Sequence, residues 1–333
     1  MLTVDWTGTT SAIIGKKHGL DPKELTQTYQ QPLAQAVDTL VSNANKPGAW
    51  SRWLTLGQQP EVVSAIQSYA QSVQGRYEDV VLIGIGGSSL GPKALVQALR
   101  HPQWNLLSAE KRHQYPRFHV LDHMDSDVMQ GLWDVLDLSK TLFVVVSKSG
   151  TTIEPTSAMA DVLERYDQKG LPWADHLVAI TDPEKGLLRP FANKYQLPTF
   201  EVPDDVGGRF SVFSPVGLLP AALVGIDIEK LMAGIQSIYP AVTNPDWLQN
   251  PAAQGAAILV ESRKRGKPIH GFMPYSRCLA LVADWFVQLW AESPGKAKIY
   301  QKRCFSLPPD RAVWGLKIST FNFNCWLKGH TIK

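Results

Sequence analysis

The sequence has few of the features that mark secreted, membrane-bound or metal-binding proteins. It holds 3 cysteines, all in the last sixth of the chain, and an odd, clustered set is not typical of a disulfide framework. Residues 1–15 lack the basic start and the apolar core of a signal peptide. No apolar run approaches the roughly 20 residues of a membrane span. We therefore expect a cytoplasmic protein without a membrane partner.

The net charge, the composition and the length are those of an ordinary globular protein. The net charge of +3 is too small to predict binding to nucleic acid. Apolar residues make up 44% and charged residues 19% of the 333 residues, which is an ordinary globular composition. This length suffices for two domains of roughly 100–200 residues each. His123 and His270 stand singly, without the spacing of metal ligands, so we predict no metal site.

Short apolar runs that end at glycine or at polar residues predict a parallel β-sheet. The runs cover residues 80–83, 118–121, 142–146 and 177–180, with helical patterns at residues 92–99 and 156–166 between them. Strands that alternate with helices indicate an α/β fold with a doubly wound parallel sheet. Such sheets bind ligands at the carboxyl ends of their strands, where small polar residues stand in this sequence.

The same patterns divide the chain into four parts. These are an N-terminal helical segment (1–58), a complete α/β domain (59–225), an incomplete second α/β unit (226–298) and an aberrant tail (299–333). In the second unit we expect helices at residues 252–263 and 279–291 and a weak strand at residues 268–273. This unit is too short to close a sheet of its own.

A glycine-rich turn follows the first predicted strand. Residues 84–92 read GIGGSSLGP, and the glycines allow a tight turn and a close approach of the backbone to a ligand. Pro92 suits the first turn of a helix, whose free N–H groups attract an anion. Ser89 occupies the last glycine position of the dinucleotide fingerprint, so the turn does not match a nucleotide site. A plain strand-to-helix turn explains this motif alone equally well.

A second motif, SKSGTT at residues 147–152, follows the third predicted strand and precedes a helix. It brings four hydroxyls, one ammonium group and a helix N-terminus into one short stretch. Hydroxyl and backbone donors in this arrangement suit a phosphate monoester. A helix cap needs only one Ser or Thr, so phosphate binding is the better interpretation.

Two further motifs supply groups of opposite charge. In GGRFS at residues 207–211, paired glycines can bring Arg209 against a site, although a lone surface arginine is the commoner arrangement. A helical pattern ends at Glu292, and Gln288 lies four residues earlier on the same face. The field at the C-terminal end of a helix disfavours a carboxylate, and this promotes proton uptake, as a general base requires. Taken alone, Glu292 is more simply a surface residue.

Together and in this order, the four motifs resemble the glucose-6-phosphate isomerase family over about residues 50–298. Each motif is moderately specific, and the set of four at suitable spacing is highly specific. The resemblance implies sugar-isomerase (SIS) domains of flavodoxin-like topology, the second of them incomplete, and a homodimer. It also implies reversible isomerisation of glucose 6-phosphate to fructose 6-phosphate through an enediol(ate), a step of glycolysis and gluconeogenesis, without a cofactor.

The resemblance also implies roles for single residues. Those implied to bind the substrate are Gly87, Ser88, Ser147, Lys148, Ser149, Thr152 and Gln288. Ser147, Ser149 and Thr152 would hold the phosphate with Lys148 beside them, and Gly87 and Ser88 would line the sugar. Arg209 would stabilise the negative charge of the enediolate, and Glu292 would be the base that moves a proton between C1 and C2.

The end of the sequence departs from the family. The resemblance implies a ring-opening histidine in an Asp-x-His segment and a lysine near the C-terminus, and neither motif is readable; His330 does not match. Back-translation of residues 314–333, read from the third base of each codon, permits Asp-Leu-His followed by an amphipathic helix. We therefore predict a C-terminal truncation with a frameshift between about Lys296 and Arg303, and weak or absent activity of this chain.

Two alternatives stay open. A non-catalytic SIS-type phosphosugar-binding module would keep the phosphate loop and need no base. The unmatched histidine favours this module, and Glu292 counts against it. Another SIS enzyme, such as the isomerase half of a glucosamine-phosphate synthase, is disfavoured by the helix that ends at Glu292 and by the Gly-Gly-Arg segment. In each case we expect a sugar phosphate as the partner.

Overall fold

The computed structural model describes residues 4–294, which fall into two compact units. Residues 4–58 and 230–272 form a helical unit, and residues 59–229 and 273–294 form a unit that contains a β-sheet. We call them the helical unit and the sheet unit and describe each by itself. The predicted aberrant tail, its His330 and the predicted frameshift lie outside the described residues.

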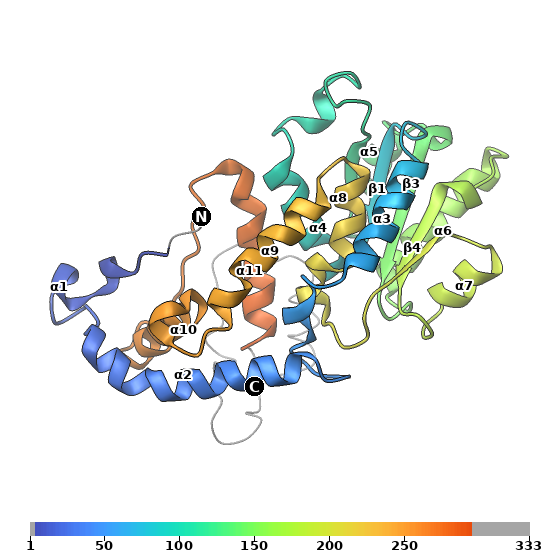
Figure 1. The fold of residues 1–333 in the computed structure, drawn as a ribbon. Helices are drawn as coiled ribbons and strands as arrows, with labels where there is room; N and C mark the ends of the chain where they lie inside the picture. The colour runs from blue at the N-terminus through green and yellow to red at the C-terminus, as the bar shows by residue number, and fades with distance from the viewer. Residues whose placement is uncertain (1–3, 295–333) are drawn as a thin grey trace, which may run out of the picture. The chain divides into compact units, whose positions relative to one another are not determined.

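The sheet unit is built on a parallel sheet of five strands in the order β2-β1-β3-β4-β5 (Figure 1). The strands are β1 (Asp79–Ile83), β2 (Arg117–Leu121), β3 (Thr141–Ser147), β4 (Leu177–Thr181) and β5 (Thr199–Glu201). Val81 of β1 pairs with His119 of β2 on one side and with Phe143 of β3 on the other. This is the flavodoxin-like strand order, so the predicted doubly wound α/β fold is confirmed.

The four predicted strands are confirmed, and the sheet holds one more. β5 is 3 residues long, begins directly after Pro198 and pairs only with β4. An edge strand this short contains no apolar run, and its residues are half-buried or exposed. Periodicity therefore could not predict it.

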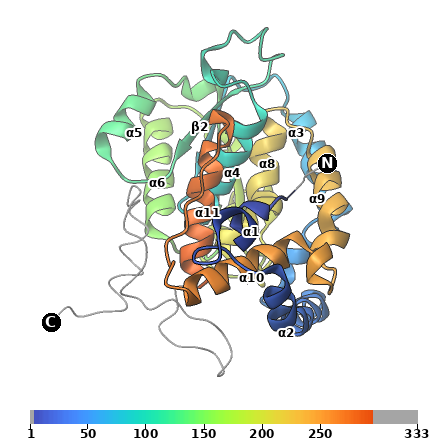
Figure 2. The same cartoon turned by 90° about the vertical axis from the view of Figure 1, so that its left-hand side faces the viewer.

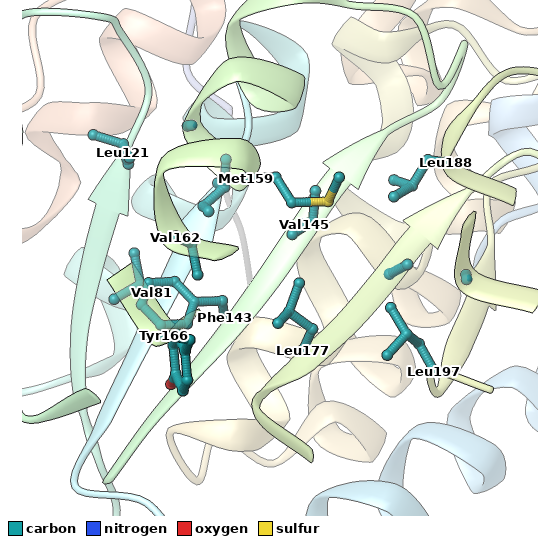
Figure 3. Close-up of a cluster of buried hydrophobic side chains, with 14 of the residues drawn as sticks. Val81, Leu121, Phe143, Val145, Met159, Val162, Tyr166, Leu177, Leu188 and Leu197 are labelled. Atoms are coloured by element: carbon teal, nitrogen blue, oxygen red, sulfur yellow. The ribbon is translucent and has the colours of Figure 1, made fainter. Parts of the chain in front are cut away.

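Side chains point alternately to the two faces of the sheet along each strand, and apolar side chains stand on both. Helices therefore cover both faces. The helices of the sheet unit are α3 (Pro60–Ser72), α4 (Gly87–Leu99), α5 (Ser126–Trp133), α6 (Ile153–Gln168), α7 (Leu188–Lys194), α8 (Pro215–Leu223) and α11 (Ala280–Glu292). On one face, α5, α6 and α7 pack on a buried cluster of apolar side chains (Figure 3). Phe143 lies in this cluster next to Val81 and Leu177, its partners in the neighbouring strands. The buried hydroxyl of Tyr166 in α6 is satisfied by donating to the carbonyl oxygen of Leu138 (2.6 Å).

The opposite face of the sheet is covered by α3, α4 and α8. Val80 and Leu82, which alternate with Val81 along β1, are fully buried on this side. A strand buried on both faces has no polar side, which explains the continuous apolar run in the sequence. α11 packs along α4 in the same unit (Figure 2), and this contact brings the C-terminal end of α11 toward the turn that begins α4.

The helical unit contains α1 (Ser11–Ile14), α2 (Pro22–Ala44), α10 (Pro251–Lys264) and most of α9 (Ile228–Val242). Its core gathers around Trp247, which is fully buried in a cluster with Leu25 and Tyr29 of α2 and Ala253 of α10. The side chain of Asn250 caps α10 by accepting hydrogen bonds from two N–H groups of the first turn, each 3.0 Å long.

The weak strand that we predicted at residues 268–273 is wrong. This segment is irregular backbone, because Pro268 and Gly271 interrupt its apolar residues and residues 226–294 offer it no partner strand. The described part of the predicted second unit therefore consists of helices without a second sheet. Its assignment to an incomplete SIS domain stays a prediction.

The expected start of the helix after the first strand is also wrong. α4 begins at Gly87 rather than at Pro92, because Gly86 adopts a φ of 57° and turns the chain directly into the helix. Pro92 lies inside α4. The whole glycine-rich motif is thus the turn and first part of a helix, which places its N–H groups at the edge of the sheet.

A buried ionic cluster fastens β1 to β2 at the other end of the sheet. The carboxylate of Asp79 is inaccessible to solvent and accepts two hydrogen bonds from Arg117 (2.7 and 2.6 Å). His119 Nε2 lies 2.9 Å from the same carboxylate. Burial alone would raise the pKa of Asp79, but the hydrogen bonds from His119 and Arg117 outweigh burial and hold it below its usual range.

We expect Asp79→Asn to lower the free energy of unfolding of the sheet unit by about 1.5–3 kcal/mol at pH 7. Because the pKa of Asp79 is lower in the folded than in the unfolded chain, its stabilisation is complete above the unfolded value of about 3.9 and is lost as the pH falls through the folded value. The difference between parent and variant should therefore shrink below about pH 4. Urea unfolding between pH 3 and 7 measures it, with the exposed Asp167→Asn as control. Equal stability of the parent and the Asp79 variant at pH 7 would contradict this role.

Candidate active site

The candidate site lies where the strand order of the sheet reverses. β1 and β3 are neighbours, and each leads at its carboxyl end into a helix, α4 after β1 and α6 after β3. Ligands of doubly wound sheets bind at this switch point. Neither helix has a side-chain hydrogen bond that caps its N-terminus. The first-turn N–H groups of both helices are therefore suited to an anion.

The hydroxyls of the SKSGTT motif converge on one another. Thr152 Oγ1 lies 3.4 Å from Ser147 Oγ and 3.3 Å from Ser149 Oγ, and Thr151 Oγ1 lies 3.2 Å from Ser149 Oγ. Gly150 makes this possible with a φ of 64°, which turns the loop back on itself. Thr152 is the N-cap residue of α6, yet its hydroxyl does not cap the helix. The capping interpretation that we weighed from the sequence is therefore not what these hydroxyls do.

The glycine turn after β1 contacts the Gly-Gly-Arg segment at backbone distance. A Cβ atom added at Gly87 would lie 2.3 Å from the carbonyl carbon and oxygen of Gly208 and 2.8 Å from the N atom of Arg209. Only glycine fits at such an approach. The hydroxyl of Ser211 donates to the carbonyl oxygen of Gly208 (2.7 Å) and lies 3.5 Å from the carbonyl oxygen of Gly87, so it restrains the same contact. The start of α4 thus determines where Arg209 leaves the backbone.

Arg209 and Glu292 form an ion pair. Arg209 Nη1 lies 3.5 Å from Glu292 Oε2, and the side chains are 23% and 20% exposed, so water reaches the pair but does not surround it. Arg209 Nε donates to the hydroxyl of Ser293 (2.9 Å), and its guanidinium lies over the ring of Phe210, 4.7 Å from the ring centroid. Three contacts therefore fix the direction of the guanidinium.

Glu292 is the last residue of α11, where the helix dipole disfavours its charge, as the sequence predicted. The ion pair with Arg209 offsets this cost. Gln288, one turn earlier, donates from Nε2 to Glu292 Oε1 (3.0 Å). Both carboxylate oxygens thus have a partner. The Oε1 atom of Gln288 is buried and has no hydrogen-bond partner, so it can accept one from a ligand.

Lys148, which we expect beside the phosphate, contacts backbone carbonyls in this structure, and its place beside a phosphate stays a prediction. Its Nζ donates to the carbonyl oxygens of Asp204 (2.7 Å) and Val206 (2.8 Å). Burial lowers the pKa of Lys148, and the nearby carboxylates of Asp204 and Asp182 act in the opposite direction. The ammonium group is therefore already bonded to the segment that precedes Arg209.

The structure groups the predicted site residues into two sets. Ser147, Ser149 and Thr152 form the hydroxyl loop, whereas Arg209, Glu292 and Gln288 form the charged pair with its amide partner. Gly87 contacts the backbone of Gly208 and Arg209 and so lies next to the charged set. Ser88 follows Gly87 in the first turn of α4 and is half-buried there. The contacts of Lys148 connect the two sets.

Sequence reasoning missed two residues of the site, Ser211 and Ser293. Both stand inside the motifs, close behind the residues that carry charge, but a serine at such a place has no pattern that reveals its partner. Within residues 4–294, no three or more His, Cys, Asp or Glu side chains are grouped to hold a metal ion. In the same part of the chain, no helix is both long and apolar enough to cross a membrane.

The geometry defines an α/β protein with two uncapped helix N-termini at the switch point of its sheet and an acid held against a guanidinium in the same unit. The family described as "Phosphoglucose isomerase" matches residues 59–320. The chain belongs to this family. The match extends past Lys298, where the motif resemblance ends; the frameshift stays a prediction.

Several curated relatives carry the name glucose-6-phosphate isomerase. The one from Carboxydothermus hydrogenoformans is 42% identical over 237 residues, which cover 71% of this chain and 51% of the relative. One from Thermus thermophilus is 38% identical over 265 residues, covering 79% of this chain and 60% of the relative. The chain therefore spans between half and two thirds of the length of these relatives.

Solved structures agree with the fold. A hypothetical protein from Thermus thermophilus superposes with a TM-score of 0.75 at 36% identity, over 86% of this chain and 65% of that one. A glucose-6-phosphate isomerase from Chlamydia trachomatis gives a TM-score of 0.66 at 24% identity, over 83% of this chain and 56% of that one. The second likeness shows the fold alone.

We expect Gly87→Ala to destabilise the sheet unit by about 1–3 kcal/mol, because the new methyl group would overlap the backbone of Gly208, which cannot move aside like a flexible side chain. Thermal or urea unfolding measures this change. Gly131→Ala is the matched control, since nothing lies within 4 Å of a Cβ atom there in α5. The control should be neutral or more stable by up to about 1 kcal/mol. If Gly87→Ala is as stable as Gly131→Ala, the close contact does not exist.

Proposed function

We propose that this site isomerises glucose 6-phosphate and fructose 6-phosphate reversibly. The observation that carries the proposal is the carboxylate of Glu292, held by Arg209 and Gln288 in the same unit as the hydroxyl loop. A base and a fixed cation are the groups that an aldose–ketose proton transfer requires. Family membership and relatives named glucose-6-phosphate isomerase at 38–42% identity support the choice of reaction.

The phosphate of the sugar binds in the hydroxyl loop. Ser147, Ser149 and Thr152 donate hydrogen bonds to its oxygens, and the uncapped N-terminus of α6 adds backbone N–H donors. In the free protein these hydroxyls lie 3.3–3.4 Å apart, longer than ordinary hydrogen bonds between hydroxyls. They therefore lose little when they turn to a ligand.

The chemical step is a proton transfer between adjacent carbons. Glu292 removes the proton from C2 of the open-chain aldose; the C–H electrons form the C1–C2 double bond, and negative charge moves to the oxygen on C1. The proton then returns to C1 from Glu292, the hydroxyl on C2 passes its proton to the oxygen on C1, and C2 becomes the carbonyl carbon of the ketose. Arg209 stabilises the charge of the enediolate, and Gln288 and Gly87 with Ser88 line the sugar. These steps use only protons of the substrate and the carboxylate.

The guanidinium has a second role before substrate binds. It offsets the unfavourable position of the Glu292 carboxylate at the end of α11 and holds that carboxylate in place. The contact length of 3.5 Å is loose for a charge-assisted hydrogen bond. The fixed cation therefore loses little when Glu292 takes up its proton and the negative charge moves to the substrate oxygen.

Other parts of the proposal rest on the sequence alone. Ring opening is assigned by resemblance to a histidine that is not readable in this sequence, so the residues described here account for the reaction of the open-chain sugar. A homodimer, a cytoplasmic location and the lack of a cofactor, a metal or a nucleic-acid partner stay predictions.

A non-catalytic phosphosugar-binding module is the second candidate, because the hydroxyl loop is complete without the acid. It predicts sugar-phosphate binding without proton transfer. Substitution of Glu292 distinguishes the two candidates. A binding module keeps its affinity for the sugar phosphate when Glu292 is replaced, and it shows no exchange of substrate protons in any form of the chain.

We expect Ser149→Ala to weaken binding of fructose 6-phosphate by about 10- to 100-fold, since one charge-assisted hydrogen bond is worth about 1.5–3 kcal/mol. Isothermal titration calorimetry measures the affinity. Ser157→Ala, on the exposed surface of α6, is the matched control and should bind like the parent. Unchanged affinity of the Ser149 variant, with measurable binding by the parent, would remove this loop as the phosphate site.

We expect Glu292→Gln to slow the exchange of solvent deuterium into C1 of fructose 6-phosphate by about 10²–10⁴-fold, because the base is gone while the shape remains. Proton NMR in D₂O reports this transfer whichever way the ring opens. Asp284→Asn, at an exposed position of the same helix, should exchange at the parent rate. Equal, measurable rates for the parent and the Glu292 variant would exclude Glu292 as the base, and a parent that binds fructose 6-phosphate without any exchange would favour the non-catalytic binding module.

A further inference from the structure

Lys148 is the one residue of the SKSGTT motif whose side chain leaves the hydroxyl loop. Its ammonium donates to two backbone carbonyls, those of Asp204 and Val206, at 2.7 and 2.8 Å. Two of its three N–H donors are therefore bonded to the backbone, and each such bond from a charged group contributes to stability. Burial lowers the pKa of Lys148, and the two carbonyl oxygens satisfy the partly buried ammonium.

The backbone that carries Lys148 is itself fixed. The carbonyl oxygen of Ser147, the last residue of β3, accepts a hydrogen bond from the hydroxyl of Thr181 (2.8 Å). The carbonyl oxygen of Lys148 accepts one from the N–H of Asp182 (3.3 Å). Both partners belong to β4 or directly follow it. Lys148 therefore projects from the rigid edge of the sheet.

The segment that Lys148 holds leads directly to Arg209. Val206 is fully buried, and its N–H donates to the carbonyl oxygen of Pro203 (3.1 Å), so residues 203–206 form a closed turn. Gly207 and Gly208 follow and have no side chains with which to anchor the chain. The carbonyls held by Lys148 and the contact of Gly208 with Gly87 are thus two restraints on the approach to Arg209.

We propose that Lys148 is a positioning residue that ties the phosphate loop to the segment carrying Arg209. The bond network runs from the end of β3, through the ammonium, to residues 204–206 and on to the guanidinium that faces Glu292. Through this network, the position of the cation that stabilises the oxyanion depends on the loop that binds the phosphate. This role of Lys148 in catalysis rests on the proposed function.

The test compares the parent with variants of the full chain by ¹⁵N NMR. Arg209 Nε–H, which donates to Ser293, gives a side-chain signal that Arg209→Lys assigns by its loss. In Lys148→Met we expect this signal to shift or disappear and the amides of residues 204–208 to exchange about tenfold faster. Binding of inorganic phosphate, read from the amides of residues 149–152, should change by less than about threefold.

Ser149→Ala is the matched control and should give the opposite result, weaker phosphate binding with an unchanged Arg209 signal. Lys148→Arg keeps the charge and two donors and should restore the Arg209 signal. If Lys148→Met does not fold, Lys148→Gln, which removes the charge and shortens the side chain but keeps an amide NH₂, is read in the same way.

An unchanged Arg209 signal in the Lys148 variant overturns the proposal, whatever happens to phosphate binding. If phosphate affinity falls by about tenfold or more while the Arg209 signal is unchanged, Lys148 is a phosphate ligand instead. If the parent binds no phosphate, the proposed function fails while the Arg209 signal still decides the role of Lys148.

Discussion

The site depends on one close contact between two glycines. Gly87 and Gly208 approach so closely that a single methyl group would not fit between them. The contact fixes the start of α4 against the segment that carries Arg209, and α11 packs along α4 and ends at Glu292. The position of the guanidinium relative to the carboxylate therefore follows from backbone packing. The bonds of the Lys148 ammonium to residues 204 and 206 add a side-chain restraint to this backbone packing.

The fold was predictable where burial is complete. β1, β3 and β4 are buried along their whole length and appear in the sequence as unbroken apolar runs. β5 is short and lies at the edge of the sheet, so it has no such run. The apolar residues at 268–273 suggest a short strand. A strand also needs a partner strand, and the sequence pattern contains no information on partners.

The site was predictable as a set of residues but not as a geometry. The motifs placed Arg209 and Glu292 among the candidates, and the structure places them 3.5 Å apart, although they are far apart in sequence. Nothing in the motif indicated that the ammonium of Lys148 bonds backbone carbonyls, because a lysine among hydroxyls fits a phosphate equally well. Ser293 was invisible for a similar reason, since its hydroxyl has a role only where Arg209 lies against it.

The most direct measurement is a crystal structure of this chain with fructose 6-phosphate bound. We expect the phosphate within hydrogen-bond distance of the hydroxyls of Ser147, Ser149 and Thr152, and C1 and C2 beside the carboxylate of Glu292 with Arg209 near their oxygens. Lys148 should keep its two carbonyl partners. A phosphate bound elsewhere in the unit, or reacting carbons out of reach of Glu292, would contradict the site described here.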